Sequence, residues 1–324
     1  KARFLLCAWY RSSVYTASAL QQMSGNESVD HGVAYSEKNV AVGLRNNRRY
    51  AVKQPPEPSV LKRTLGSITA VFLGSCFCSV TMTIQIGVLL FNKLFGLDRN
   101  KFVAGWLRRI SGRFTSRSHP LFNFKLLGDV PEKLPEKCVI VCNHISNADV
   151  AAITTLFPFT CKFVGRGELR YIPFMGWMMV LAGDVFVDYK KDKDRTDGTK
   201  AVNRDEAYAL MKRYVSEGTP VALFPEGWRS RNQKILFFKD GAFTLAKECN
   251  AAILPIALVG TEALWPMGYD APCGGRAFMK IGKPISAEEV AASSMDDLKK
   301  ASQQAIIDLK AEIEEEVNET DKAR

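Results

Sequence analysis

Histidine is scarce in this chain, and the usual metal-binding spacings are missing. The 324 residues contain three histidines and eight cysteines, with no CxxC pair and no HExxH motif. Zinc sites in proteins need three or four such side chains at short spacings. We therefore expect neither a metal ion nor another cofactor. Cysteines scattered over apolar segments are typical of buried free thiols in a reducing compartment.

Acidic residues are rare in the N-terminal part of the chain. Residues 1–125 hold 18 Lys and Arg against 5 Asp and Glu, and the remaining residues hold 26 against 29, so the net charge of +10 originates in the first part. A basic region of this kind binds either nucleic acid or an anionic membrane surface. It contains no recognised nucleic-acid-binding motif and no aromatic side chains interleaved with its basic clusters. We therefore expect membrane contact and no nucleic-acid partner.

Charged residues are absent between Arg63 and Lys93. This stretch is 29 residues long, and about 20 apolar residues suffice to span the core of a bilayer. Interspersed Gly, Ser, Thr and Gln dilute it, so a spanning helix, a re-entrant hairpin and a buried helix pair remain possible. Basic residues flank both ends, so the positive-inside rule gives no orientation, and two short segments in one leaflet fit as well as one span. We expect a membrane-associated helical segment at 61–118.

Residues 1–60 form a basic region that we expect to be disordered or to act as a targeting sequence. Residues 1–25 contain Lys1, Arg3 and Arg11 but no acidic residue. This composition is similar to that of organelle transit peptides, although a flexible basic tail has the same composition. The prolines at 55, 56 and 58 indicate an extended linker. The third part of the chain, 119–324, is the folded domain with its C-terminal helices.

Apolar strands and helices alternate from about residue 121 onwards. We expect strands at 138–142, 162–165, 185–189, 221–224, 252–258 and 277–281, and helices at 149–156, 174–182, 204–216 and 242–249. This alternation favours an α/β fold with a largely parallel sheet flanked by helices. Near the C-terminus, Ile306, Leu309, Ile313 and Val317 form one apolar stripe. We interpret this stripe as a surface helix packed on the domain, without a catalytic role.

A histidine and an aspartate follow the first of these strands. His144 and Asp149 are five residues apart, which is about 500° on an ideal helix, so their side chains would point roughly 140° apart. They can meet only if the chain bends at the carboxyl end of the strand, where open α/β sheets bind ligands. There the carboxylate would fix the imidazole tautomer and leave the other ring nitrogen as a general base. The alternative is a capping Asn or Ser beside an incidental histidine.

Four ordered segments resemble the motif blocks of a known family. They are Asn143-His144 with Asp149, IPFMG at 172–176, FPEGWRS at 224–230 and ILPI at 253–256. In order and spacing they resemble the PlsC-like glycerolipid acyltransferases, most of all the 1-acyl-sn-glycerol-3-phosphate (lysophosphatidate) acyltransferases. The resemblance covers about residues 122–284. It implies the glycerolipid acyltransferase fold for 119–324, preceded by the membrane-associated segment.

The resemblance also implies a reaction. A fatty acyl chain would pass from acyl-CoA to the sn-2 hydroxyl of lysophosphatidic acid, with His144 and Asp149 as the catalytic pair and no covalent intermediate. Backbone N–H groups at the helix start after His144 would stabilise the oxyanion. Glycerol 3-phosphate or another lysophospholipid is the alternative acceptor, and a non-catalytic lipid-binding protein is the alternative function. The expected location is the endoplasmic reticulum membrane, with a plastid or mitochondrial membrane as alternatives.

The third block carries the acceptor-binding residues by this resemblance. Arg229 offers a planar fork suited to a phosphate, and Glu226 would hold that fork or bond a substrate hydroxyl. Gly227 permits the tight turn between them. Trp228 stands where the family most often has Thr, which puts the shape of the acceptor pocket in doubt. The other expected substrate-binding residues are Asn143, Arg166, Pro173, Gly176 and Lys239.

Overall fold

Strand β2 (Cys138–Cys142) lies at the centre of a seven-stranded sheet with the order β1-β9-β8-β2-β7-β3-β4. The computed structural model describes residues 40–41, 43–96, 99–191, 199–267 and 272–323, so the expectation for residues 1–39 lies outside it. The other strands of the sheet are β1 (Phe122–Leu127), β3 (Lys162–Arg166), β4 (Val185–Val187), β7 (Val221–Leu223), β8 (Ala252–Val259) and β9 (Gly275–Ile281). All pairings are parallel except that of β8 with β9. The predicted α/β class with a largely parallel sheet is confirmed.

Side chains of β2 alternate between two hydrophobic layers, as the pleat of a strand requires. Val139 and Val141 belong to one buried cluster, and Cys138, Ile140 and Cys142 belong to the other. All five are at most 1% exposed. A strand covered on both faces reads as a continuous apolar run, which is why the sequence placed β2 correctly.

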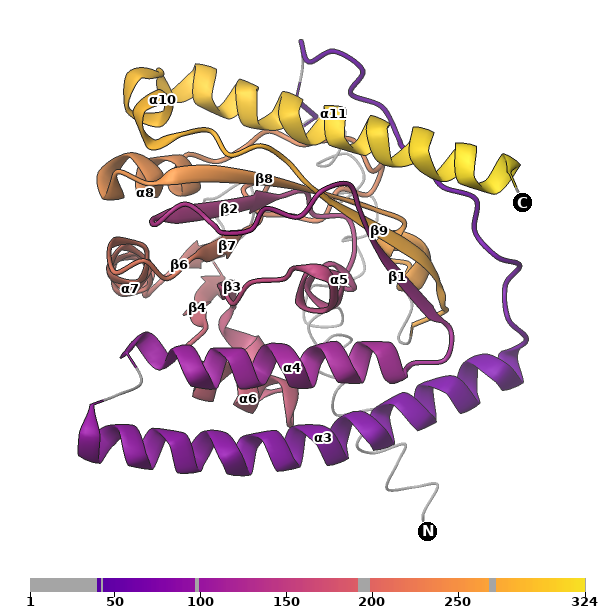
Figure 1. Cartoon of the computed structure of the whole chain (residues 1–324), viewed down its shortest axis with the longest axis horizontal. Helices are drawn as coiled ribbons and strands as arrows, with labels where there is room; N and C mark the ends of the chain where they lie inside the picture. Colours follow the sequence, from indigo (N-terminus) through magenta and orange to yellow (C-terminus); the bar gives the residue numbers. More distant parts are fainter. Residues whose placement is uncertain (1–39, 42, 97–98, 192–198, 268–271, 324) are drawn as a thin grey trace.

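Helices cover both faces of the sheet, as Figure 1 shows. One layer contains α7 (Arg204–Ser216), α8 (Gly241–Cys249), α10 (Ala287–Ala292) and α11 (Met295–Lys322). The opposite layer contains α5 (Asp149–Leu156), α6 (Met175–Ala182) and α4 (Phe102–Ser118), with α3 (Val60–Phe95) outside them. Short elements complete the chain: η1 (Arg99–Lys101), η2 (Gly167–Tyr171) and α9 (Thr261–Leu264).

The strand expected at 185–189 is divided in two. Its second half forms β5 (Tyr189–Lys191), which pairs antiparallel with β6 (Thr199–Ala201) in a separate small sheet. Asp188 lies between the halves: its backbone N–H donates to Asn203 Oδ1 at 2.7 Å, and its carboxylate binds Arg170 at 3.0 Å. The Asp188 carbonyl accepts the Val202 N–H at 2.9 Å, so Asp188 continues the pairing of β5 with β6 while its N–H and side chain bond Asn203 and Arg170.

Helix α3 is one continuous helix of 36 residues. At 1.5 Å per residue it is about 54 Å long, which exceeds the roughly 30 Å core of a bilayer. It packs along α4, where Phe77 stacks on Phe114 with 3.6 Å between ring centroids. Within the described part of the chain, α3 alone is long and apolar enough to cross a membrane by length and composition. The uncharged stretch is therefore one helix, without the hairpin or the helix pair that the sequence left open, and it packs on α4, which lies outside the stretch.

Residues 43–59 lie against the folded domain, which differs from the disordered region expected up to residue 60. The side chain of Gln54 bonds the backbone N–H and C=O of Arg276, at 2.7 and 3.0 Å. Tyr50 is only 2% exposed and belongs to the same buried cluster as α11. The apolar residues that anchor this segment are isolated, so the sequence shows no helix or strand periodicity that would indicate a packed segment here.

Candidate active site

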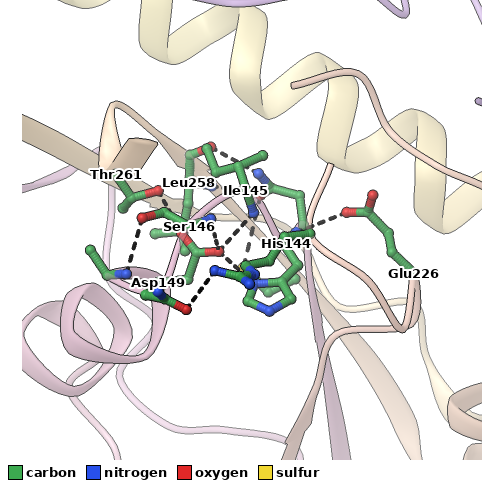
Figure 2. A network of polar contacts seen from close by, with 12 residues as sticks. His144, Ile145, Ser146, Asp149, Glu226, Leu258 and Thr261 are labelled. Carbon is green, nitrogen blue, oxygen red and sulfur yellow. Dashed lines mark hydrogen bonds and ion pairs between the residues drawn. The ribbon is translucent and has the colours of Figure 1, made fainter. Parts of the chain in front are cut away.

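His144 and Asp149 meet at the carboxyl end of β2. His144 follows the strand and Asp149 begins α5, so the chain bends between them as expected (Figure 2). The imidazole Nδ1 lies 2.7 Å from Asp149 Oδ2. The Asp149 side chain is fully buried, whereas that of His144 is 22% exposed. The pair therefore leaves part of the imidazole exposed to solvent and keeps the carboxylate inside.

Asp149 accepts hydrogen bonds from four groups. Besides His144, the backbone N–H groups of Ile145 and Ser146 donate to Oδ2 at 2.8 and 2.9 Å, and the Thr261 hydroxyl lies 2.5 Å from Oδ1. A carboxyl group surrounded by donors acts as an ionised acceptor. Its partner Nδ1 must then carry the imidazole hydrogen, so Nε2 is the atom that can take a proton from a substrate.

Thr261 was not expected from the sequence. It begins α9 directly after β8, which is the neighbour of β2 in the sheet. Because β2 and β8 are parallel, their carboxyl ends share one edge, and a polar residue after β8 can reach Asp149. The signal available in the sequence was a polar residue placed just after the apolar run of the strand expected at 252–258.

Glu226 holds the backbone of His144. Its Oε1 accepts the His144 N–H at 2.8 Å, and its Oε2 accepts the Leu236 N–H at 3.0 Å. We expected this carboxylate to orient Arg229 or to bond a substrate hydroxyl, and the structure differs because both oxygens serve backbone donors. The side chain is buried, and this burial raises the pKa of Glu226.

The segment after β7 encloses His144 from further sides. The Phe224 ring stacks on the imidazole with 4.2 Å between centroids, and the Ser230 N–H donates to the His144 carbonyl at 2.7 Å. Gly227 adopts a φ of 72°, in the left-handed region that favours glycine. A Cβ there would lie 2.8 Å from Lys239 Nζ, so the lysine closely covers this turn.

Arg229 is tied to the loop between His144 and Asp149. Its Nη1 donates to Asn147 Oδ1 at 2.7 Å. Burial lowers the pKa of the Arg229 guanidinium, and the negative charge of Asp149 opposes this effect. Lys239 adds a second positive charge, with its ammonium 5.9 Å from the centre of the Trp228 ring. Two positively charged side chains, Arg229 and Lys239, therefore lie near the loop between His144 and Asp149.

The residues of the second block stand at and after the end of strand β3, which lies next to β7 on the side away from β2. Arg166 ends β3, pairs with Glu168 at 3.4 Å and covers the Tyr189 ring at 5.0 Å. Since β3 is parallel to β7 and β7 to β2, Arg166 ends at the same edge of the sheet as His144.

Pro173 and Gly176 shape the connection between η2 and α6. The Pro173 carbonyl accepts the Met175 N–H at 2.7 Å. A Cβ on Gly176 would lie only 2.1 Å from the Leu169 carbonyl oxygen, so only glycine permits this approach. The geometry gives both residues a role in the backbone, whereas we expected them to bind substrate.

Two further expectations need correction. Asn143 is buried and bonds the Leu258 C=O and N–H at 3.0 and 2.8 Å, so its side chain joins the ends of β2 and β8. Three of the N–H groups near the helix start, where we expected the oxyanion to bind, already have acceptors within the protein. Those of Ile145 and Ser146 donate to Asp149, and that of Ala148 donates to Ser146 Oγ at 3.1 Å.

The nearby cysteine is unsuited to covalent catalysis. Cys142 is fully buried, and this burial raises the pKa of its thiol well above the usual value, which disfavours the nucleophilic thiolate. Over the residues that the structure describes, no cluster of His, Cys, Asp and Glu has a composition that could hold a metal ion.

Comparison with known proteins agrees with this geometry. The acyltransferase family model matches residues 128–259. A 1-acyl-sn-glycerol-3-phosphate acyltransferase of Chlamydomonas reinhardtii is 30% identical over 258 residues, which cover 78% of this chain and 71% of that protein. The chain belongs to the acyltransferase family. This confirms the resemblance found in the four sequence blocks.

Two other proteins show how far the similarity of this acyltransferase extends. The 1-acyl-sn-glycerol-3-phosphate acyltransferase of Saccharomyces cerevisiae is 29% identical over 192 residues, covering 58% of this chain and 60% of the yeast protein. The crystal structure of the acyltransferase PlsC from Thermotoga maritima superposes with a TM-score of 0.59 at 23% identity, covering 78% of this chain and 97% of that one. This structure supports the fold assignment.

Proposed function

We propose that the chain transfers a fatty acyl group from acyl-CoA to the sn-2 hydroxyl of lysophosphatidic acid, producing phosphatidic acid. The observation that carries this proposal is the His144–Asp149 pair, held at the carboxyl edge of the sheet with Nε2 as the proton acceptor. The Chlamydomonas and yeast relatives are named for acyl transfer to 1-acyl-sn-glycerol 3-phosphate, which supports the same acceptor here.

The proposed reaction proceeds by direct attack. His144 Nε2 takes the proton of the acceptor hydroxyl, and the hydroxyl oxygen attacks the thioester carbonyl of acyl-CoA. The C–S bond then breaks, the CoA sulfur takes the proton from the imidazolium, and the ester and free CoA leave. Asp149 stabilises the positive charge on the ring throughout. The reaction changes no oxidation state and needs no redox cofactor. We therefore propose the acyl thioester as co-substrate and no further cofactor.

Positive charge around the histidine loop supports an anionic acceptor. Arg229 bonds Asn147 in that loop, and Lys239 covers the turn at Gly227. Arg166 ends strand β3, which pairs with β7. Guanidinium groups bind phosphate oxygens through paired hydrogen bonds. We propose that Arg229 and Lys239 bind the phosphate of the acceptor, with Arg166 adding positive charge at the same edge.

A membrane supplies and receives the lipids in this proposal. Helices α3, α4 and α6 lie on one side of the molecule (Figure 1) and expose large apolar side chains there. Examples are Phe72, Ile84 and Phe91 of α3, Trp106 of α4, and Trp177 and Val180 of α6. Exposed apolar patches of this extent mark interaction surfaces.

The basic residues that flank α3 suit an anionic bilayer surface. Binding to anionic vesicles that persists at high salt is expected, because apolar contact is insensitive to screening. Release from the vesicles at high salt would argue against insertion of α3. The endoplasmic reticulum is the proposed compartment, and fractionation of cells distinguishes it from plastid or mitochondrial membranes.

Comparison of acceptors tests the proposed reaction. CoA release by the detergent-solubilised protein is measured with oleoyl-CoA and lysophosphatidic acid, glycerol 3-phosphate or lysophosphatidylcholine. We expect the largest kcat/KM with lysophosphatidic acid, because it combines the phosphate with a fatty chain. A preference for one of the other acceptors would reassign the substrate, and no release with any of them would favour the non-catalytic alternative.

A further inference from the structure

Helix α11 bonds the segment 233–236, which lies between β7 and α8, through two buried polar side chains. Lys310 Nζ donates to the Gln233 carbonyl at 2.6 Å, and Gln303 Nε2 donates to the Leu236 carbonyl at 2.9 Å. Lys310 is 1% exposed and Gln303 is 4% exposed. The apolar stripe predicted for this helix is buried as expected, but the two polar side chains give the helix a second role.

The segment 233–236 is connected to His144 through the side chain of Glu226. The Leu236 N–H donates to Glu226 Oε2, while Glu226 Oε1 accepts the His144 N–H. Three hydrogen bonds and the main chain of Leu236 therefore link Gln303 of α11 to the backbone of His144. Figure 2 shows the last step, with Glu226 reaching toward the backbone of His144.

Two buried carboxyl groups lie near the ammonium of Lys310. Glu226, from the turn after β7, and Glu262, from α9, both attract the buried ammonium, and burial raises the pKa of each carboxyl. The positive charge of Lys310 lowers the pKa of Glu226, whereas the negative charge of Asp149 raises it.

Two other titratable groups lie near the ammonium: the Cys142 thiol on β2, whose burial disfavours its charged form, and the Arg48 guanidinium of the N-terminal segment, whose positive charge lowers the pKa of Lys310. A buried carboxylate is costly unless a cation accompanies it. Lys310 is the cation that α11 contributes to Glu226.

We propose that Lys310 is a positioning residue for His144: its ammonium favours the ionised form of Glu226, and the carboxylate holds the His144 backbone in place. Both Glu226 oxygens accept backbone N–H groups, at 2.8 and 3.0 Å. A protonated carboxyl would direct its own O–H toward one of these donors, so that hydrogen bond would be lost. The link to catalysis rests on the proposed function, whereas the link between Lys310 and Glu226 does not.

An NMR titration tests the inference without an activity assay. The chain has only three histidines, so protein labelled with [15N]histidine gives few amide signals, and the signal lost in His144→Gln is that of His144. Its amide proton is bonded to Glu226 and therefore reports the ionisation of that carboxyl. Glu226→Gln separates this transition from titration of the imidazole itself.

Removal of the positive charge should raise the pH at which Glu226 ionises. In Lys310→Met the midpoint should move up by about 1 pH unit or more, the usual effect of an opposite charge nearby. Lys310→Gln provides a second neutral side chain that can still donate to Gln233, and Lys310→Arg should restore the midpoint. Gln303→Met should leave the midpoint unchanged because it keeps the ammonium.

A matched control comes from the same helix. Lys299 is also buried on α11, but it pairs with Asp240 at 2.8 Å, so Lys299→Met should not move the midpoint. An unchanged midpoint in both neutral Lys310 variants, or an equal shift in Lys299→Met, would overturn the inference. If the midpoint moves but the wild-type protein releases no CoA, the proposed function fails and the positioning role stands.

Discussion

Asp149→Asn removes the negative charge beside His144 while preserving the shape of the side chain. The amide can place its oxygen where Oδ2 lies and so keep accepting from His144, Ile145 and Ser146. Its NH2 group would then face the Thr261 hydroxyl, which can turn from donor to acceptor. The variant should therefore fold, with a change in the free energy of unfolding of about 1 kcal/mol or less.

Loss of the negative charge should lower kcat. When the imidazole takes the substrate proton, its positive charge lies roughly 4 Å from the carboxylate charge, given the 2.7 Å contact. Two unit charges at 4 Å attract each other by about 4 kcal/mol at an effective dielectric constant of 20. Since about 1.4 kcal/mol corresponds to a tenfold rate change, kcat should fall by about 10³-fold.

CoA release and thermal unfolding of the same preparations provide the assay. Thr261→Val serves as the partner variant. In the double variant, Asp149→Asn with Thr261→Val, the asparagine NH2 group faces a methyl group and has no acceptor there. An unsatisfied buried donor costs about 1–3 kcal/mol, so the double variant should unfold at a lower temperature than Asp149→Asn. A kcat for Asp149→Asn within tenfold of the wild type would refute the electrostatic role of Asp149.

Two further substitutions test the acceptor site and the second block. Arg229→Ala should raise KM for lysophosphatidic acid by about tenfold or more, from the loss of a charge-assisted hydrogen bond, with little change in KM for oleoyl-CoA; equal rises for both substrates would contradict a phosphate-binding role. Gly176→Ala should lower the unfolding temperature, because its Cβ would lie 2.1 Å from the Leu169 carbonyl oxygen. The control Gly241→Ala, whose Cβ meets nothing within 4 Å, should not lower it.

The sheet and the His144–Asp149 pair could be predicted because their signals are local. The all-buried strand β2 reads as an apolar run, and the five-residue spacing required a bend that β2 and α5 provide. Strand β1 was missed because its residues alternate between half-buried and exposed rather than forming an apolar run.

The supports of the site depend on contacts between distant parts of the chain. Thr261 lies 112 residues after Asp149, and Glu226 lies 82 residues after His144. Only the parallel pairing of the strands brings these residues to one edge. Lys310 was missed for another reason: a lysine in an amphipathic helix usually faces solvent, and the sequence does not reveal the buried carboxylates that surround it.

Replacement of His144 tests the central claim most directly. The rate of CoA release with oleoyl-CoA and lysophosphatidic acid is compared for the wild type and His144→Ala, together with their thermal unfolding. We predict a kcat at least 10²-fold lower in the variant, the usual contribution of a general base, with unfolding close to that of the wild type. A folded variant that retains more than a tenth of the wild-type rate would contradict the assignment of His144 as the base.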